Sequence, residues 1–249
     1  MALAANRLKL LTPGRMTMLG GSLVAAQAPG GAALLARLGL DYFEIDGSSR
    51  TPSSVSAMAQ LGRTMGIPAI VRVPEAHRAF FGPALEGGAW GLSIPGINDL
   101  RSAQAVVSAT RYWPLGLRGT FEPGPQNDYL DDPQDLDAVN KQLHITIRVD
   151  PSIEERLLCD MAALNGIDAI EFESVPARAL VDGLGPVIGA VKEAGALVSA
   201  PARTAEDITV LADAGVQMIR LADDIDVIAS HFENLVTLLK ETDRARGAA

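Results

Sequence analysis

Charged side chains interrupt several short apolar runs of this sequence at alternate positions. They are the pairs Glu44 and Asp46, Arg148 and Asp150, and Glu171 and Glu173, with the single residues Arg72 and Arg220. Because alternate residues of a strand point to the same side, each pair projects to one face. The opposite face of each run is apolar and needs a covering of helices, so the charges must point inward. A buried charge costs several kcal/mol unless it is paired or binds a ligand or metal.

Two interpretations of these inward charges are open. One is an internal salt-bridge network, and the other is a polar pocket at the carboxyl ends of the strands, where barrel enzymes carry their chemistry. We favour the pocket, because charges that converge from several strands are what an active site requires. Arg72 is the strongest single candidate, since a guanidinium offers a planar, bidentate clamp for a substrate carboxylate. Paired carboxylates on one strand also suit acid–base work if burial separates their pKa values.

The elements that must position these residues follow a regular alternation of short apolar runs and segments with helical periodicity. Several predicted helices end in Gly followed by an apolar strand start, as in 38–41 (Leu-Gly-Leu-Asp), 65–68 (Met-Gly-Ile-Pro), 165–168 (Asn-Gly-Ile-Asp) and 194–197 (Ala-Gly-Ala-Leu). Gly just past a helix adopts the left-handed cap conformation without side-chain cost. About eight such βα units predict one (β/α)8 barrel domain over residues 1–249, with an open doubly wound sheet as the alternative. No G-x-G-x-x-G follows the first run, which weakens a dinucleotide-binding fold.

The apolar runs locate the expected strands. They are Met16–Leu19, Tyr42–Ile45, Ala69–Val73, Gly91–Ile94, Leu117–Thr120, Ile145–Val149, Ala169–Phe172, Leu197–Ser199 and Met218–Leu221. The stretch Glu122–Asn140, rich in Pro, Asp and Gln, follows one of these runs, so we expect a long loop on the active-site face. The long last helix, Asp224–Arg246, carries an apolar stripe and is expected to be the eighth barrel helix or to pack against a neighbouring subunit.

Composition excludes several classes of function. The chain has 21 Lys and Arg against 30 Asp and Glu, and an acidic chain without a basic run is a poor candidate for nucleic-acid binding. It has neither a long uncharged apolar run nor a signal-peptide pattern, so we expect a cytoplasmic protein that does not bind membranes. The single cysteine, Cys159, fits a reducing compartment and a core position. The histidines lack metal-binding spacing, and neither a G-x-S-x-G elbow nor a P-loop is present.

Four segments between Leu34 and Leu239 resemble the HpcH/HpaI family of 2-oxo-acid aldolases. They are Gly39–Gly47, Ile70–Pro74, Ala109–Gly119, and the run Ile145–Asp150 with the following Asn165–Phe172. The third is the most specific, because Tyr-x-Pro-x-Gly-x-Arg-Gly is hard to reach by chance. Members of that family are (β/α)8 enzymes that make or break a C–C bond next to a pyruvate or oxaloacetate enolate on a divalent metal. The resemblance therefore implies a small carboxylate substrate, a metal such as Mg2+ or Mn2+, and a homo-oligomer, trimeric or hexameric, in which the last helix reaches a neighbour.

The resemblance also assigns roles to individual residues. Arg72 falls on the arginine that binds the oxo-acid carboxylate, and Asp46 on the aspartate that orients the catalytic histidine. Asp150 falls on a metal-ligating glutamate. Arg118 and Gly119 fall on the Arg-Gly of the family motif, which makes them candidates for substrate binding.

The sequence departs from the family at several catalytic positions. The family's Glu-His after Asp-Gly is Ser48 and Ser49 here, so the histidine base is absent. The place of the second metal carboxylate, counted without gaps from Asp150, is Pro176, which cannot ligate a metal. Charged residues stand where the family has apolar, small or amide side chains, namely Glu44, Arg148, Glu171 and Glu173. From these we take Ser49 and Glu44 as further catalytic candidates, Arg148 and Glu173 as substrate-binding candidates, and Glu171 as a metal ligand beside Asp150.

Three functions are compatible with these residues. The leading one is a diverged aldolase or lyase that acts on a small 2-oxo acid. The second is a metal-free cyclase, isomerase or decarboxylase in a biosynthetic pathway, and the third is a catalytically inactive homologue that binds a ligand or a partner. Fold alone does not separate them. Bound metal would favour the first, an intact pocket without metal the second, and a pocket filled by salt bridges the third.

Overall fold

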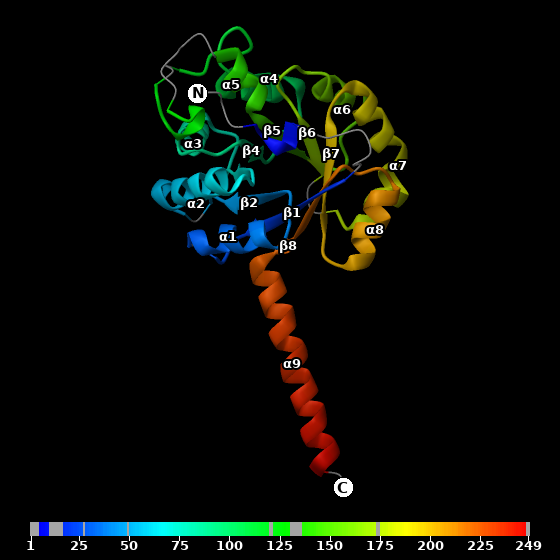
Figure 1. Cartoon of the computed structure of the whole chain (residues 1–249). Helices are drawn as coiled ribbons and strands as arrows, with labels where there is room; N and C mark the ends of the chain where they lie inside the picture. Colours follow the sequence, from blue (N-terminus) through cyan, green and yellow to red (C-terminus); the bar gives the residue numbers. More distant parts are fainter. Residues whose placement is uncertain are drawn as a thin grey trace.

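The computed structural model describes residues 5–9, 17–26, 28–48, 50–119, 122–129, 136–172 and 175–247. Within these ranges, eight parallel strands close into a barrel in chain order (Figure 1). The strands are β1 (Met18–Leu23), β2 (Tyr42–Asp46), β3 (Ala69–Arg72), β4 (Gly91–Ile94), β5 (His144–Val149), β6 (Ala169–Phe172), β7 (Leu197–Ala202) and β8 (Met218–Asp223). The predicted (β/α)8 barrel is confirmed, and the open-sheet alternative is wrong.

The α-helices alternate with the strands, and all but the last of them lie around the outside of the barrel. They are α1 (Pro29–Arg37), α2 (Pro52–Met65), α3 (Arg78–Glu86), α4 (Leu100–Thr110), α5 (Leu136–Gln142), α6 (Glu155–Ala162), α7 (Ala177–Ala194), α8 (Ala205–Asp213) and α9 (Asp224–Gly247), with the 3-10 helices η1 (Arg7–Lys9) and η2 (Pro125–Asn127). Gly66 and Gly195 end α2 and α7 in the left-handed conformation, with φ of 69° and 112°. The glycines predicted to end helices therefore do so, because they adopt the left-handed conformation that a helix cap requires.

Two apolar regions hold the barrel together. The larger one lies between the strands and the helices and includes Phe43, Ile45 and Val71. The smaller one fills the amino-terminal end of the barrel interior and consists of Leu8, Met18, Tyr42, Ile70, Ala169 and Met218. Leu8 comes from η1, so this short helix closes that end of the barrel. The charged side chains lie beyond this cluster, toward the carboxyl ends of the strands.

The close approach of β1 to the Tyr42 ring leads to a stability prediction. A Cβ atom on Gly20 would overlap the Tyr42 ring, whereas one on Gly183 in α7 would meet nothing within 4 Å. We expect Gly20→Ala to lower the free energy of unfolding by about 1–3 kcal/mol, because the buried ring has no space to move. Gly183→Ala is the control and should leave stability unchanged or raise it by up to about 1 kcal/mol. Equal thermal unfolding midpoints for the two variants would contradict this account of the barrel interior.

The predicted strand Leu117–Thr120 is wrong over its described part. Leu117 is 79% exposed, and its N–H donates to the carbonyl of Ser108 at 2.6 Å, while the N–H of Arg118 donates to Arg111 at 2.9 Å. The segment therefore folds back on the end of α4 and joins no sheet. The apolar run resembles a strand, but these bonds occupy its backbone.

The stretch Glu122–Asn140 consequently lies at the other end of the barrel from the one we expected. Since no strand precedes it directly, it connects α4 to β5 and must lie near the amino-terminal ends of the strands. Its described parts contain η2 and the start of α5. Asp128 forms an ion pair of 3.0 Å with Arg63, which lies near the carboxyl end of α2. The expectation of a loop on the active-site face is therefore wrong.

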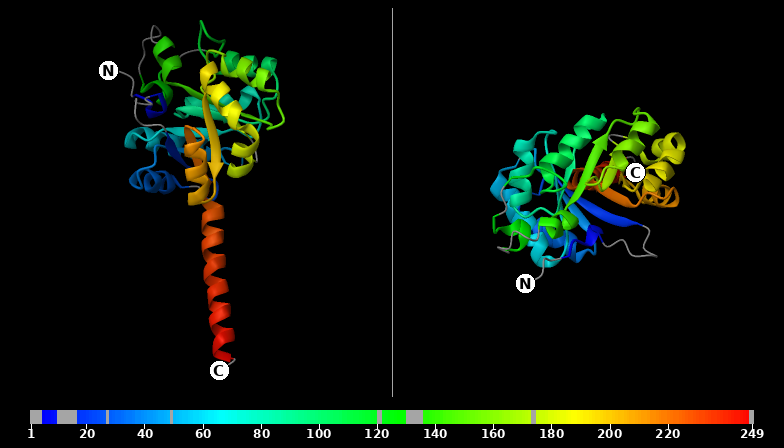
Figure 2. Two further views of the ribbon diagram at one scale, coloured as in Figure 1. Left: turned by 90° about the vertical axis from the view of Figure 1, so that its right-hand side faces the viewer. Right: turned by 90° about the horizontal axis from the view of Figure 1, so that it is seen from above.

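The last helix does not cover the barrel. Helix α9 leaves the end of β8 and extends away from the rest of the chain (Figures 1 and 2). Its apolar stripe is between 48% and 62% exposed and consists of Ile225, Ile228, Phe232, Leu235, Val236 and Leu239. The expectation of an eighth barrel helix is wrong for this chain alone. No helix among the described residues has both the length and the apolar composition that a membrane crossing requires.

The first residue of α9 is hydrogen-bonded to the loop that follows β1. The Asp224 carboxylate accepts hydrogen bonds from the N–H groups of Val24, Ala25 and Ala26 at 2.6–2.8 Å. Burial alone would raise the pKa of Asp224, but these bonds outweigh it and lower the pKa. The loop after β1 is thus tied to the base of α9.

Candidate active site

Polar and charged side chains from every strand line the barrel interior beyond the apolar cluster. They are Ser22 (β1), Glu44 and Asp46 (β2), Arg72 (β3), Ser93 (β4), Arg148 (β5), Glu171 (β6), Ser199 (β7) and Arg220 (β8). The strand register places several of them side by side, as in Asp46 with Arg72, Arg72 with Ser93, and Arg148 with Glu171. The sequence prediction that alternate charges converge inside the barrel is therefore correct for Glu44, Asp46, Arg72, Arg148, Glu171 and Arg220, and wrong for Asp150, which is exposed beyond β5. We call this set the ionic cluster.

The closed part of the ionic cluster is centred on Glu171. Arg148 Nη2 lies 2.6 Å and Arg220 Nη2 3.4 Å from Glu171 Oε1, while the Ser199 hydroxyl donates to Oε2 at 3.0 Å. Burial alone would raise the pKa of Glu171, but the two guanidinium groups outweigh it and lower the pKa. This carboxylate is therefore held ionised with both oxygens occupied.

Arg220 joins this part of the cluster to β2. Its Nη1 lies 3.2 Å from Asp223 Oδ1, and its Nε lies 3.8 Å from Glu44 Oε1. Glu44 is 3% exposed, and its Oε1 accepts no hydrogen bond of good geometry, although two guanidinium groups lie within 4.0 Å. An oxygen with unused acceptor capacity thus lies between Arg220 and Arg72.

Arg72 is the most accessible arginine of the cluster. Its side chain is 23% exposed, compared with 10% for Arg148 and 9% for Arg220. Its Nη2 lies 3.1 Å from Asp46 Oδ2 and its Nε 4.0 Å from Glu44 Oε1. Burial alone would lower the pKa of Arg72, but the two carboxylates outweigh it and raise the pKa. The guanidinium is thus a fixed positive charge.

Asp46 holds Arg72 in place. Its Oδ1 accepts the N–H of Ser48 at 3.0 Å, and its other oxygen faces Arg72. Burial alone would raise the pKa of Asp46, but the bonds from Ser48 and Arg72 outweigh it and lower the pKa. The predicted pair of Arg72 and Asp46 is therefore together at the carboxyl ends of β2 and β3.

Other predicted site residues lie apart from Arg72 or outside the described ranges. Arg118 stacks over the Tyr112 ring, with its Cζ atom 4.7 Å from the ring centroid. Arg118 and Gly119 follow α4 and so lie toward the amino-terminal end of the barrel, away from the ionic cluster. Ser49 and Glu173 are outside the described residues. The structure therefore brings together Glu44, Asp46, Arg72, Arg148 and Glu171.

The two predicted metal ligands do not form a donor set that fits a divalent metal. Asp150 is exposed just beyond β5, where its carboxylate accepts bonds from the hydroxyl and N–H of Ser152. Glu171 lies level with Arg148, two residues deeper, which corresponds to roughly 6–7 Å along a strand. Both Glu171 oxygens are bonded elsewhere, and no group of three or more His, Cys, Asp or Glu side chains able to hold a metal occurs within the described ranges. Pro176, at the place of the second family ligand, caps α7.

Sequence reasoning missed Asp223 as a member of the cluster. Arg220 and Asp223 are three residues apart, so strict alternation would place them on opposite faces of β8. The register between β1 and β8 shifts between Gly20 and Ser22, and this irregularity brings Asp223 opposite Ser22, whose hydroxyl donates to it at 2.5 Å. Irregularities of this kind redirect a side chain without a clear signal in the sequence.

Fold and site together define a (β/α)8 barrel with a half-buried arginine–carboxylate pair at the end where such barrels carry their chemistry. No family model matches the sequence. The chain is similar to a hydroxypyruvate/pyruvate aldolase of Deinococcus radiodurans, with 26% identity over 232 residues, 86% of this chain and 82% of that protein. It is also similar to a 4-hydroxy-2-oxovalerate aldolase of Rhodococcus jostii, with 30% identity over 144 residues, 56% of this chain and 55% of that protein.

The fold is also similar to solved structures. An HpcH/HpaI aldolase/citrate lyase family protein from Burkholderia cenocepacia superposes with a TM-score of 0.80 at 21% identity, over 95% of this chain and 100% of that one. At this identity the superposition shows the fold alone. The similarity to named aldolases comes from the sequence relatives. The resemblance to the HpcH/HpaI aldolases that the sequence motifs indicate is therefore confirmed.

Proposed function

We propose that the protein is a carbon–carbon lyase of the aldolase type that acts on a small 2-oxo acid. The observation that carries the proposal is the placement of Arg72, whose guanidinium is half-buried, partly accessible and fixed by Asp46. A guanidinium in this setting binds a carboxylate or an enolate oxygen more strongly than it would in water. The similarity to named 2-oxo-acid aldolases supports the same substrate class.

In this proposal, different residues of the cluster bind the substrate and position the residues that bind it. Arg72 binds the substrate carboxylate and stabilises negative charge as the C–C bond breaks or forms. Asp46 orients Arg72, and the Oε1 atom of Glu44, which has acceptor capacity left, lies beneath it. Arg148 and Arg220 keep Glu171 ionised and form the floor of the site.

The test is activity of the purified protein toward oxaloacetate decarboxylation and pyruvate aldol addition. Each assay is run with added Mg2+ or Mn2+ and after treatment with a chelator. Turnover of either 2-oxo acid supports the proposal, and its metal dependence separates a metal-assisted lyase from a metal-free one. Absence of turnover under every condition would contradict the proposal.

A metal-free decarboxylase or isomerase is the second candidate. The observation that favours it is that both Glu171 oxygens accept hydrogen bonds from Arg148, Arg220 and Ser199, so a metal shared with Asp150 would have to compete with these partners. Full turnover after chelation, with no metal retained by the protein, would support this candidate over the first.

We further propose that the protein works as a homo-oligomer in the cytoplasm, with the apolar stripe of α9 covered by a second copy. A stripe of six large apolar residues, each about half exposed, is unusual on an isolated soluble chain. Because α9 extends away from its own barrel, it is in a position to reach a neighbour (Figure 2).

Substitution within the stripe tests this assembly. Phe232→Glu places a charge in the middle of the stripe, and we expect it to reduce the mass of the particle measured by light scattering after gel filtration. Ser230→Glu, at an exposed polar position of the same helix, is the matched control and should keep the wild-type mass. A monomeric wild-type protein, or an unchanged mass for Phe232→Glu, would contradict this proposal.

A further inference from the structure

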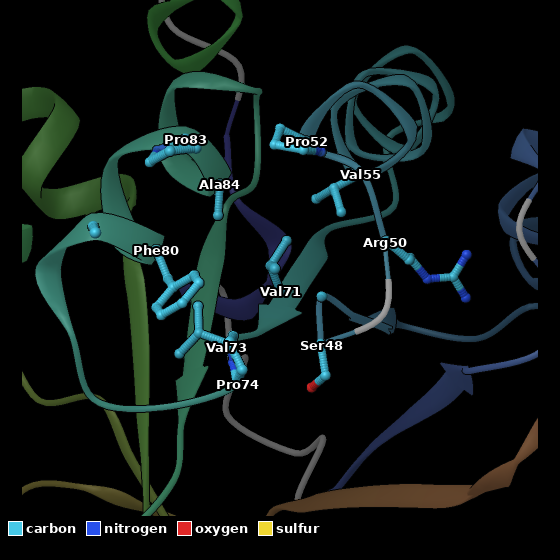
Figure 3. Close-up of a pocket in the computed structure, with 12 residues that line it drawn as sticks. Ser48, Arg50, Pro52, Val55, Val71, Val73, Pro74, Phe80, Pro83 and Ala84 are labelled. Carbon is cyan, nitrogen blue, oxygen red and sulfur yellow. The ribbon is translucent and has the colours of Figure 1, made fainter.

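An apolar pocket lies outside the barrel, between α2 and α3 (Figure 3). It is formed by the loops that follow β2 and β3, the helix-facing side of β3, the first turn of α2 and the first two turns of α3. The two loops lie at the carboxyl ends of the strands, as Arg72 does. Its volume is about 330 Å3, at the lower end of the range for ligand pockets. The apolar lining includes Val55, Val71, Val73, Phe80, Pro83 and Ala84.

The inner wall of the pocket adjoins the arginine–carboxylate pair. Gly47 directly follows Asp46, and Val73 directly follows Arg72. The N–H of Gly47 donates to the carbonyl of Arg72 at 2.9 Å. Gly47 and Ser48 both line the pocket, and the N–H of Ser48 donates to Asp46 Oδ1 at 3.0 Å, so the rim of the pocket at the end of β2 lies beside the carboxylate that holds Arg72.

The pocket offers an apolar group a site without competing charge. Arg50 supplies the single charge among the lining side chains, and its guanidinium donates instead to the carbonyls of Leu23 and Val24 at 3.0 and 2.9 Å. Figure 3 shows the Arg50 side chain directed away from the other lining residues. Val71 and Val73 are each 2% exposed, so the floor of the pocket is firmly packed.

The geometry points to a second subsite, in which this pocket takes the alkyl or phenyl arm of the substrate while Arg72 holds its carboxylate. The inference rests on the proposed function and narrows its substrate class to 2-oxo acids with a short apolar arm. It is independent of how the C–C bond is cleaved, because it concerns binding alone.

The test is calorimetric binding of straight-chain 2-oxo acids from pyruvate to 2-oxohexanoate, with phenylpyruvate as a ring-bearing probe. We expect the dissociation constant to fall about threefold to fourfold for each added methylene until the pocket is filled. In Ala84→Leu, which fills the pocket, pyruvate should bind as before while the gain with chain length disappears. Phe80→Ala opens the pocket wall at a residue that is 39% exposed, and it should also weaken the gain in affinity with chain length. This second variant keeps the test decisive if Ala84→Leu does not fold.

The control and the contrary results separate the subsite from the proposed function. Leu117→Ala removes an exposed apolar side chain at the other end of the barrel and should leave the whole series unchanged. Pyruvate binding without any dependence on chain length would overturn the subsite and leave the proposed function standing. A chain-length dependence that survives in both pocket variants would also overturn it. Failure of every 2-oxo acid to bind would overturn the proposed function and the subsite together.

Discussion

Replacement of Arg72 by lysine is expected to lower kcat/KM for a 2-oxo acid by roughly 10- to 100-fold, because one charge-assisted hydrogen bond is worth about 1.5–3 kcal/mol. Lysine keeps the positive charge next to Glu44 and Asp46 but loses the planar pair of donors that binds a carboxylate at two points. Arg72 is held by Asp46 at 3.1 Å, so the wild-type donors are already oriented before substrate arrives. We expect the loss to appear mainly as a higher KM if Arg72 acts on the substrate carboxylate. We expect it to appear mainly as a lower kcat if Arg72 acts on the developing enolate.

Arg63→Lys is the matched control for this experiment. Arg63 is also half-buried and faces a single carboxylate, Asp128, at 3.0 Å, but it lies at the amino-terminal end of the barrel. Its replacement should leave kcat/KM within about twofold of the wild type while testing the same chemical change. Equal losses in the two variants would mean that arginine-to-lysine changes act through stability, and the assignment of Arg72 would fail.

Much of the fold was predictable from the sequence because its signals are local and repeated. Helix-ending glycines such as Gly66 and Gly195 and the short apolar runs recur with each βα unit, so one misjudged unit does not change the architecture. The misjudged unit was Leu117–Thr120, where an apolar run has a strand-like composition but Leu117 is exposed. That error moved the segment Glu122–Asn140 to the wrong end of the barrel, since strand order decides on which end each loop lies.

The candidate site was predictable where it depends on alternation and was not predictable where it depends on three-dimensional pairing. Glu44, Asp46, Arg148 and Glu171 could be placed inside the barrel from period-two spacing alone. The sequence could not show that Glu171 is enclosed by two arginines and therefore unsuited to share a metal with Asp150. That fact depends on the register of β5, β6 and β8, which no local pattern specifies.

The ionic cluster agrees in part with both interpretations that the sequence left open, the internal salt-bridge network and the polar pocket. Its deeper part, around Glu171, is a salt-bridge network with little access to solvent. Its outer part, Arg72 with Asp46, is accessible enough to meet a ligand. One set of alternating charges thus supplies both a buried floor and an accessible rim, and the two parts lead to separate predictions.

Removal of the charge on Glu171 is expected to have the largest effect on stability. In Glu171→Gln, Arg148 loses its 2.6 Å carboxylate partner and Arg220 one of its three acidic neighbours. A buried charge stranded in this way costs about 3–5 kcal/mol, which lowers the thermal midpoint by on the order of 10 °C in a chain of this size. Adding Arg148→Met to Glu171→Gln removes the stranded charge and should recover part of the loss.

The matched control and the pH dependence distinguish a buried network from ordinary surface pairing. Asp182→Asn breaks the exposed pair with Arg178, whose atoms are 3.9 Å apart, and should change stability by less than about 0.5 kcal/mol. The pKa of Glu171 is lowered on folding, so its stabilising effect is complete above its ordinary value of 4.5 and is lost as the pH falls through the lower folded value. The gap between wild type and Glu171→Gln should therefore be constant near neutral pH and narrow only in acid. A gap that is small at neutral pH, or no larger than that of Asp182→Asn, would mean that the arginines find other partners and that the floor of the site is not held by Glu171.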